Sequence, residues 1–300
     1  MVAYLDEAAV RKALDWDTLI TAMETALASF SAGKVIQPVR NTLTVEEGKR
    51  YLGIMPAVAE DAMGAKLVSF YPGNAGTPHP THMAMIALFR PDTGEPLAAM
   101  DGRLITEMRT AAVSAAVTRG LAPAESRVLA LLGSGVQAEA HFEALKRVRK
   151  FAEARVWSPT RENARRFAET LGVAEARSAR EAVEGADVVV TATSATTPVL
   201  FGAWLKPGAH VNAVGAARPN WRELDDAAMH SGALIVDSRA AALAESGDVI
   251  LSKAPIFAEA GEIFAGAPKP AAGTTTIFKS LGLAVEDIAA ARLVYKAVGG

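Results

Sequence analysis

The chain has 300 residues, half of them hydrophobic, and its 31 basic and 33 acidic side chains give a formal net charge of −2. This length allows two modest domains with hydrophobic cores. The charge balance gives no electrostatic support for nucleic-acid binding, because no basic stripe interleaved with aromatic residues occurs. The absence of cysteine excludes disulfides, thiolate metal sites and a cysteine nucleophile.

Membrane and metal binding are not expected either. No stretch approaches about 18 uninterrupted apolar residues, and acidic residues near the N-terminus stand where a signal peptide would be basic and then apolar. We therefore expect a cytoplasmic protein without a membrane partner. The five histidines form no close-spaced helical ligand pair, so we predict no metal site.

The first part of the chain predicts a small sheet. Residues 67–71, 83–90 and 96–100 have strand character and are separated by turns that contain glycine or proline, which favours antiparallel neighbours. A periodic helix over 106–121 ends near Ala122–Pro123, where the second domain is expected to begin. Few obvious helices are available to cover this sheet, which favours a role in subunit contact.

Three basic side chains in this first part are candidates for binding an anion. Arg40 stands at the start of an alternating run, and Lys66 is a cation inside an otherwise apolar segment. Lys66 is either paired or extended toward solvent if it has no ligand. Arg109 falls in the first turn predicted for the helix over 106–121, where a cation is unfavourable unless an anion offsets it. Arg109 therefore points to a cofactor phosphate or a substrate carboxylate.

A glycine turn marks the start of the second domain. The apolar strand 128–132 is followed by Gly133-Ser134-Gly135-Val136-Gln137-Ala138, a G-x-G-x-x-A sequence that opens a helix ending near Val148. The N-terminus of such a helix can hold a pyrophosphate. The motif also occurs in ordinary structural turns, but the buried strand before it and the strand–helix pair at 154–158 and 161–171 favour a nicotinamide or flavin dinucleotide.

The end of the second strand of this domain bears on which dinucleotide binds. An acidic residue there would bind the ribose hydroxyls of NAD, whereas this segment holds Ser158, Thr160 and Arg161 and no acid before Glu162. Two hydroxyls and a guanidinium suit a 2′-phosphate, so we expect NADPH, with NADH possible. Alternatively, Thr160 is only the N-cap of the next helix and Arg161 a solvated residue in its first turn.

Strands and helices continue to alternate toward the C-terminus. Strands are predicted at 187–193, 210–214 and 234–237, helices at 222–230 and 240–245, and a loop at 266–273. This pattern predicts an α/β fold with a Rossmann-type, doubly wound sheet in residues 122–282. Residues 1–121, with a C-terminal helix in 283–300, are expected to form a smaller α+β domain for substrate binding and dimerisation.

Short motifs are spaced along almost the whole chain, at Gln37–Arg40, Tyr51–Pro56, Ala65–Val68, Met100–Gly102, Arg109–Ala115, Gly135–Ala138, Gly208–Ala216, Trp221–Asp225, Glu245–Asp248, Phe278–Gly282 and Val285–Asp287. In this order they resemble the ornithine cyclodeaminase/mu-crystallin family, and most of all its mu-crystallin branch. Members of that branch reduce ketimines with NAD(P)H, and in vertebrates they also bind thyroid hormone. The resemblance implies NAD(P)H-dependent reduction of cyclic ketimines, such as 1-piperideine-2-carboxylate or 1-pyrroline-2-carboxylate, to cyclic L-amino acids.

The resemblance also implies which residues act. Arg40, Lys66 and Arg109 match the basic residues around the substrate carboxylate, and Glu245 matches an acid of the substrate pocket. Lys66, Arg40 and His82 are the catalytic candidates, with Lys66 and His82 as alternatives for the proton donor. The cofactor contacts implied are Thr81, His82, Arg109, Gly133, Gly135, Val136, Gln137, Ser158, Thr160, Arg161, Asn163, Thr193, Ser194, Val214 and Ser280. Pro159 departs from mu-crystallin, which has an arginine there, so Arg161 would have to replace it.

One further departure bears on the reaction. In ornithine cyclodeaminases an aspartate acts on the substrate amine in the segment that here reads Gly215–Pro219, and Ala217 stands at its position. A methyl group can neither accept a proton nor hold an ammonium. We therefore expect a reductase rather than a cyclodeaminase. An alanine-dehydrogenase-like enzyme and an NADPH-dependent binder of hormone-like ligands remain alternatives, and the resemblance implies a homodimer.

Overall fold

The structure is a computed structural model that describes residues 2–300, and it divides into two compact units. The first unit ends at Arg109 and also includes Gly282–Gly300, while the second spans Thr110–Leu281. Helix α3 (Arg103–Leu121) begins in the first unit and ends in the second. The substrate-binding and dimerisation roles expected of the domains remain predictions.

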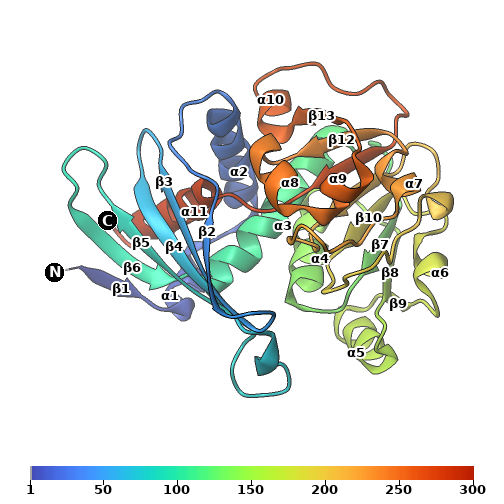
Figure 1. The fold of residues 1–300 in the computed structure, drawn as a ribbon, viewed down its shortest axis with the longest axis horizontal. Helices are drawn as coiled ribbons and strands as arrows, with labels where there is room; N and C mark the ends of the chain where they lie inside the picture. Colours follow the sequence, from blue (N-terminus) through green and yellow to red (C-terminus); the bar gives the residue numbers. More distant parts are fainter. Residues whose placement is uncertain (1) are drawn as a thin grey trace. The chain divides into compact units, whose positions relative to one another are not determined.

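The first unit contains a six-stranded sheet (Figure 1). Its strands are β1 (Ala3–Leu5), β2 (Asn41–Glu46), β3 (Arg50–Val58), β4 (Met63–Phe70), β5 (His82–Phe89) and β6 (Pro96–Asp101), in the order β1-β6-β5-β4-β3-β2. Strands β4 to β6 pair antiparallel, as predicted, β2 and β3 continue the antiparallel pairing, and β1 joins β6 in parallel. Strand β3 was not predicted. A short 3₁₀ turn, η1 (Pro72–Asn74), lies between β4 and β5.

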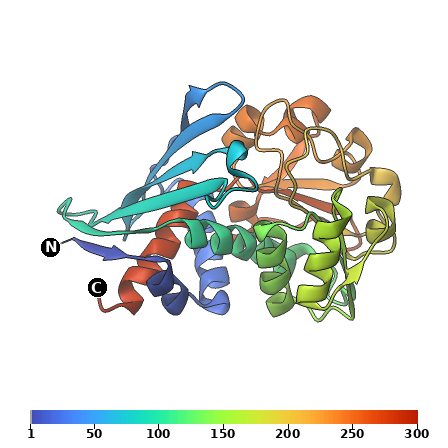
Figure 2. The same ribbon diagram turned by 90° about the horizontal axis from the view of Figure 1, so that it is seen from below.

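Three helices cover one face of this sheet, so the expectation of too few helices was wrong. Helices α1 (Glu7–Ala13), α2 (Trp16–Ser31) and α11 (Ala284–Ala297) lie together on that face in Figure 2, and α11 packs on β3, β4 and β5. The side chains of Asp6 and Asp15 cap α1 and α2 by accepting from the backbone N–H groups of Ala9 and Thr18. Aspartate is a preferred N-cap residue, so Asp6 and Asp15 were the signals in the sequence from which α1 and α2 could have been predicted.

Helix α3 begins earlier than predicted. The Asp101 Oδ1 atom accepts from the N–H groups of Arg103 and Leu104, at 3.0 and 3.3 Å, and so starts the helix at Arg103 rather than Thr106. Arg109 therefore lies beyond the first turn, where the helix dipole no longer opposes a cation. The argument for an anion from its helix position was wrong, and its partners are described below.

The second unit is a doubly wound parallel sheet, which confirms the predicted fold class. The strands are β7 (Val128–Leu132), β8 (Glu153–Trp157), β9 (Ala174–Glu175), β10 (Val188–Thr191), β11 (His210–Ala213), β12 (Ala233–Val236), β13 (Ile256–Glu259) and β14 (Thr276–Lys279). They lie in the order β13-β12-β14-β11-β10-β7-β8-β9. Strands β7 and β10 pair directly, so the direction of winding reverses between them.

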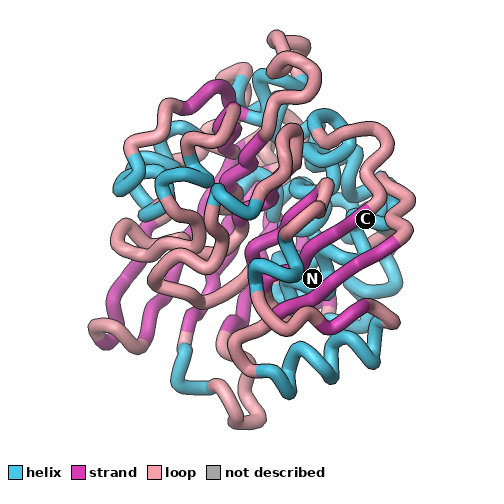
Figure 3. Tube along the Cα trace, turned by 90° about the vertical axis from the view of Figure 1, so that its right-hand side faces the viewer, coloured by secondary structure: helices cyan, strands magenta, loops and turns pink. Residues whose placement is uncertain are grey.

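Helices alternate with these strands along the chain, and Figure 3 distinguishes helices from strands by colour. They are α4 (Val136–Val148), α5 (Arg161–Leu171), α6 (Ala179–Val183), α7 (Asp226–Met229), α8 (Arg239–Glu245), α9 (Gly247–Ser252) and α10 (Ala260–Phe264), with a 3₁₀ turn η2 (Gly202–Trp204). The helix predicted over 222–230 was too long, because the Asp225 side chain accepts from Ala228 N–H and starts α7 only at Asp226. Residues 266–273 form neither helix nor strand, as predicted. Within residues 2–300, none of the helices has the length and apolar character that crossing a bilayer would need.

Candidate active site

A buried ionic cluster occupies the helix-covered face of the first unit. Lys66 Nζ lies 2.7 Å from Asp287 Oδ2, and Arg109 Nε lies 2.8 Å from Asp287 Oδ1. Arg109 also pairs with Glu286, at 2.7 Å. The side chains of Lys66 and Arg109 are only 2% and 4% exposed, and both acids are fully buried. Two predicted anion-binding cations therefore share one carboxylate contributed by α11.

Burial and charge act in opposite directions on these cations. Burial lowers the pKa of Lys66 to about 8, against the attraction of Asp287 and together with the charges of Arg109 and Arg40. Burial also acts against the charge of Arg109, but Asp287 and Glu286 outweigh it and raise the pKa of the guanidinium. Arg109 thus stays charged at all relevant pH values, whereas Lys66 can lose its proton slightly above neutral pH.

Arg40 belongs to the same cluster. It is half-buried, and its Nη2 donates to the Gly282 carbonyl oxygen at 2.9 Å. Three residues earlier, the Gln37 side-chain oxygen accepts from Val285 N–H at 2.7 Å, close to the start of α11. The segment before β2 and the segment before α11 therefore hold each other. The structure brings together all three cations that the sequence singled out in the first unit.

His82 lies on the same sheet face, farther along the strands. It opens β5, pairs across the sheet with Phe70 and stacks on its ring at 4.4 Å between centroids. The protein atoms around the ring and then the charge of Lys66 lower the pKa of His82 below its ordinary value, although the residue keeps an exposed surface. The Thr81 hydroxyl lies 3.3 Å from His82 Nδ1. A histidine in this setting is neutral at pH 7.

The glycine turn of the second unit lies at the reversal of the sheet. Gly133 has a φ of +119°, and a Cβ there would lie 2.4 Å from the Ala192 carbonyl oxygen, so the turn needs glycine for its own folding. Gly135 differs, because a Cβ there would meet nothing within 4 Å. The protein leaves space above Gly135 that its own packing does not use.

The N-terminus of α4 suits an anion. Gly135 is its N-cap, and no side chain caps the first turn, so the helix dipole and backbone N–H groups face the open space. Val136 is half exposed. These features fit a dinucleotide pyrophosphate, which Gly133, Gly135, Val136 and Gln137 would hold.

The residues predicted around a 2′-phosphate follow β8. Thr160 is the N-cap of α5, as the structural interpretation of this threonine predicts, although its side chain makes no capping hydrogen bond. Asn163 Oδ1 accepts from Arg166. Arg161 is largely exposed and pairs with Glu175 at 2.9 Å. An exposed ion pair of this kind is weak, so Arg161 can exchange Glu175 for a phosphate. Ser158 directly follows the last residue of β8.

The other predicted cofactor contacts lie at the carboxyl ends of β10, β11 and β14. Val214 N–H donates to the Thr191 carbonyl oxygen, and Ser280 N–H donates to that of Ala213. The Ser280 hydroxyl is buried and has no hydrogen-bond partner. Thr193 binds a buried glutamate described below, and Ser194 follows it in the chain. Glu245 is the half-buried last residue of α8.

Sequence reasoning missed the acids that organise these sites. Glu286 and Asp287 pair with the predicted cations, and Glu223 accepts hydrogen bonds from the loops after β10 and β11. Burial raises the pKa of the Glu223 carboxyl, although Lys279 and the neighbouring threonine hydroxyls act against this. An available signal was that Glu286 and Asp287 are adjacent acids in a helix whose other residues are mostly apolar.

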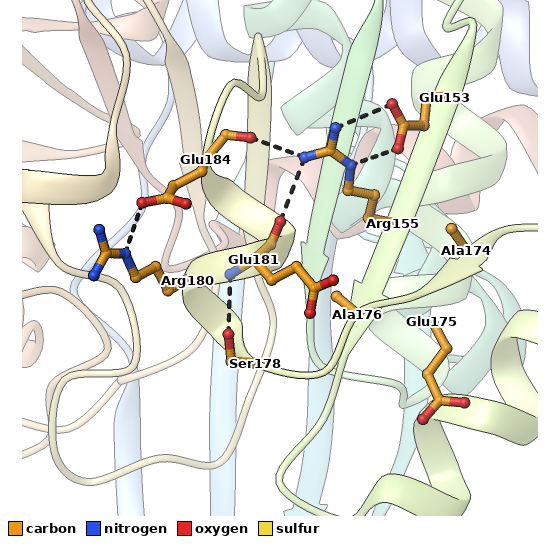
Figure 4. A pocket seen from close by; sticks show the side chains of 9 residues that line it. All are labelled: Glu153, Arg155, Ala174, Glu175, Ala176, Ser178, Arg180, Glu181 and Glu184. Carbon is orange, nitrogen blue, oxygen red and sulfur yellow. Dashed lines mark hydrogen bonds and ion pairs between the residues drawn. The ribbon is translucent and has the colours of Figure 1, made fainter.

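A cavity of about 510 Å³ lies elsewhere in the second unit, between β8, β9 and α6 (Figure 4). Its charged side chains mostly satisfy one another: Arg155 binds Glu153 at 2.6 and 3.0 Å, and Arg180 binds Glu184 at 2.6 Å. It contains none of the predicted site residues, and we assign it no ligand. Among residues 2–300, no three histidine, aspartate or glutamate side chains gather as a metal site would require.

A glycine turn at the reversal of a parallel sheet, with an uncapped helix N-terminus facing open space, defines the second unit as a Rossmann-type dinucleotide-binding domain. The chain belongs to the ornithine cyclodeaminase/mu-crystallin family, whose sequence model matches residues 2–300.

Proteins named as ketimine reductase, Δ1-pyrroline-2-carboxylate reductase and alanine dehydrogenase are similar to this chain. The chain is 55% identical to the ketimine reductase mu-crystallin of Mus musculus over 284 residues, covering 92% of this chain and 91% of the relative. It is 36% identical to a Δ1-pyrroline-2-carboxylate reductase of Bacillus cereus, covering 95% and 93%. Among solved structures, the Thermococcus litoralis Δ1-pyrroline-2-carboxylate reductase with NADH and L-proline has a TM-score of 0.94 at 36% identity, covering 99% and 97%. An archaeal alanine dehydrogenase dimer with NAD has a TM-score of 0.92 at 32% identity, covering 99% and 96%.

The two glycines of the turn predict opposite results when each is replaced by alanine. Gly133→Ala places a methyl group against the Ala192 carbonyl, so we expect it to lower the free energy of unfolding by about 2 kcal/mol or more. Gly135→Ala meets no protein atom, so stability should change by less than about 1 kcal/mol. Its methyl group should instead obstruct the pyrophosphate and raise the Kd for NADPH about tenfold or more. Denaturant unfolding and fluorescence titration measure the two quantities. Unchanged NADPH binding in folded Gly135→Ala would remove this turn from the cofactor site.

Proposed function

We propose that this chain reduces cyclic ketimines that carry a 2-carboxylate, with NADPH or NADH, to cyclic L-amino acids. The observation that carries the proposal is 55% identity over 92% of the chain to a protein named as a ketimine reductase. The pyrroline-2-carboxylate reductases, one of them solved with NADH and L-proline, support the same substrate class. We place the reaction in the cytoplasm, where reduced dinucleotides are available.

In this proposal the first unit binds the substrate carboxylate. Arg40 and Arg109 are guanidinium groups, which orient a carboxylate as well as attract it, and Lys66 adds a third positive charge. Glu286 and Asp287 pair with Lys66 and Arg109, and in this proposal the substrate carboxylate becomes a further anionic partner of the three cations. Glu245 is proposed as an acid of the substrate pocket.

The chain's own residues also prepare the imine for reduction. The dinucleotide, when bound to the glycine turn, supplies the hydride. We propose that Lys66 donates a proton to the imine nitrogen. Its pKa of about 8 leaves Lys66 protonated at neutral pH and still able to release the proton. His82 is neutral at that pH, so we assign it, with Thr81, to contact with the cofactor.

Selection between the dinucleotides is proposed to favour NADPH. Ser158, Thr160, Arg161 and Asn163 follow β8 without an acid that would repel a 2′-phosphate. The remaining cofactor contacts proposed are Arg109, Thr193, Ser194, Val214 and Ser280. Ala217 provides no carboxylate in the loop after β11, which argues against deamination of ornithine by this chain.

The assay that tests the function follows the absorbance of NADPH and NADH with 1-piperideine-2-carboxylate and 1-pyrroline-2-carboxylate. In parallel, ammonia release from ornithine, lysine and alanine is measured with NAD⁺. We expect imine-dependent oxidation of the reduced dinucleotide without ammonia release. Ammonia release without imine reduction would show a deaminating enzyme instead. Tight NADPH binding with neither reaction would show a ligand-binding protein.

Arg40 provides a specific test of carboxylate binding. Arg40→Ala removes a charged hydrogen-bond donor, so the KM for the imine should rise about ten- to hundredfold while the KM for NADPH changes less than about twofold. Steady-state kinetics with each substrate varied separately measure both values. Arg50→Ala, in β3 of the same unit, removes an exposed arginine that pairs only weakly with Glu46 and serves as the control. Equal increases in both KM values would refute the role of Arg40.

The titration of Lys66 predicts a pH dependence. Below a pH of about 8 Lys66 carries a proton, and above it the neutral amine attracts a carboxylate less strongly. The Kd of pyrrole-2-carboxylate, whose ring nitrogen does not titrate in this range, should therefore be constant below that pH. Above it, the Kd should rise by up to about tenfold per pH unit. Titrations with saturating NADPH measure this, and Lys66→Met should bind weakly without the rise. The same rise in Lys66→Met would assign the titration to another group.

We also propose a homodimer formed through the uncovered face of the first sheet. Side chains alternate between the two faces of a strand, so Leu67 points away from the face on which Lys66 meets α11. Leu67 pairs across the sheet with Met85, and both are about two-fifths exposed, as is Met83. Leu43 on β2 extends this apolar surface. Exposed apolar surfaces of this kind mark interfaces, and the archaeal alanine dehydrogenase was solved as a dimer.

Sedimentation velocity tests this interface. The protein should sediment as a dimer, and Leu67→Asp, which places a charge within the apolar surface, should dissociate it at micromolar concentration. Leu243→Asp changes an exposed leucine of the second unit and should leave the dimer intact. A monomeric wild-type protein, or a Leu67→Asp variant as dimeric as the wild type, would contradict the proposed surface.

A further inference from the structure

A fully buried carboxylate joins two loops of the second unit. Glu223 Oε1 accepts from the N–H and the hydroxyl of Thr193, at 2.7 and 2.6 Å. Its Oε2 accepts from the Thr191 hydroxyl and from Gly215 N–H, both at 2.8 Å. The side chain therefore uses both oxygens twice, and each oxygen receives one backbone N–H. It fastens the loop after β10 to the loop after β11.

The same peptide segment is held from its other side. Lys279 Nζ donates to the Gly215 carbonyl oxygen and lies 3.0 Å from Asp248 Oδ2. Asp248 Oδ1 in turn accepts from Glu223 N–H at 2.9 Å. Both the N–H and the C=O of Gly215 are thus bound by charged, fully buried side chains. A Cβ on Gly215 would lie 2.4 Å from the Glu223 carboxyl carbon, so the contact leaves room only for glycine.

This network lies directly beneath the predicted cofactor contacts. Thr191 ends β10 and Lys279 ends β14, while Gly215 follows β11, so the network joins the carboxyl ends of three neighbouring strands. Val214 precedes Gly215 and donates to the Thr191 carbonyl, and Ser280 follows Lys279. Glu223, Asp248 and Lys279 are themselves 0% exposed. They cannot touch a ligand and can act only through these neighbours.

The position in the sheet indicates which half of a dinucleotide lies above. The pyrophosphate belongs to the turn after β7, and the adenosine ribose belongs to the end of the next strand, β8. The strands β10, β11 and β14 lie on the opposite side of β7 from β8. The nicotinamide half of the dinucleotide is therefore expected over the loop after β11 that holds Val214, whereas the family resemblance places Thr193 and Ser194 on the adenine side.

We infer that Glu223 is a positioning residue that fixes the Thr193–Ser194 loop and the Val214–Ala217 loop against the bound dinucleotide. This inference rests on the proposed function, because it requires that the second unit bind NADPH or NADH. Glutamate is needed rather than glutamine. Each oxygen accepts from a backbone N–H that cannot turn around, so an amide would direct its NH₂ group at one of them.

The test compares Glu223→Gln with Asp187→Asn. Glu223 binds the carboxyl end of β10, and Asp187 is an acid next to the amino end of the same strand. Asp187 precedes β10 and accepts from the N–H groups of Arg127 and Val128, at 2.7 and 2.8 Å, while pairing with Lys206. Asp187→Asn should lower thermal stability without changing dinucleotide affinity. Glu223→Gln should lower thermal stability and also raise the Kd for NADPH about tenfold or more, measured by fluorescence titration of the folded protein.

A milder variant extends the test if Glu223→Gln does not fold. Thr191→Val keeps the shape of a fully buried side chain and removes only one donor to Glu223, so a rise of about threefold in the Kd is expected. An unchanged Kd in every folded variant at this network, or an equal rise in Asp187→Asn, would overturn the positioning role alone. A wild-type protein that binds neither NADPH nor NADH would overturn the proposed function, and this inference with it.

Discussion

The pairing of Lys66 and Arg109 with Asp287 is the interaction on which the first unit depends. Two cations at 2% and 4% exposure would be strongly unfavourable without a partner. Removing one member of such a buried pair typically costs about 3–5 kcal/mol. Asp287 thereby ties β4 and α3 to α11. The same carboxylate favours the charged forms of the two cations inside the protein. The cations have therefore already lost their water when a substrate carboxylate arrives.

What the sequence could predict depended on how local the determining contacts are. The turn at Gly133–Ala138 was predictable, because its strand, glycines and helix are consecutive. The β2–β6 meander was mostly predictable for the same reason. The parallel strands β9, β13 and β14 were not predicted. Strand β9 has only two residues, and β13 and β14 lack the continuous apolar run that marks β10 and β12.

The candidate site shows the same limit. Arg40, Lys66 and Arg109 attracted attention as cations in apolar or awkward positions, and the structure does bring them together. The pairing of these cations with acids of α11 could not be predicted, since Arg109 and Asp287 are 178 residues apart. Glu223 was equally hidden, because four donors from two distant loops converge on it. Charged residues in apolar segments indicated where the buried site lies, but only the fold shows which acidic side chains pair with them.

The return of α11 to the first unit has a consequence for the order of folding. The second unit is one continuous stretch of chain, whereas the first is completed only by residues that follow it. During synthesis on the ribosome, the second unit can reach its final contacts while Lys66 and Arg109 still lack their carboxylates. The first unit then closes last, by a long-range event with a large loop-closure cost. A nascent chain that stops before Glu286 would leave β3, β4 and β5 without the helix that packs on them.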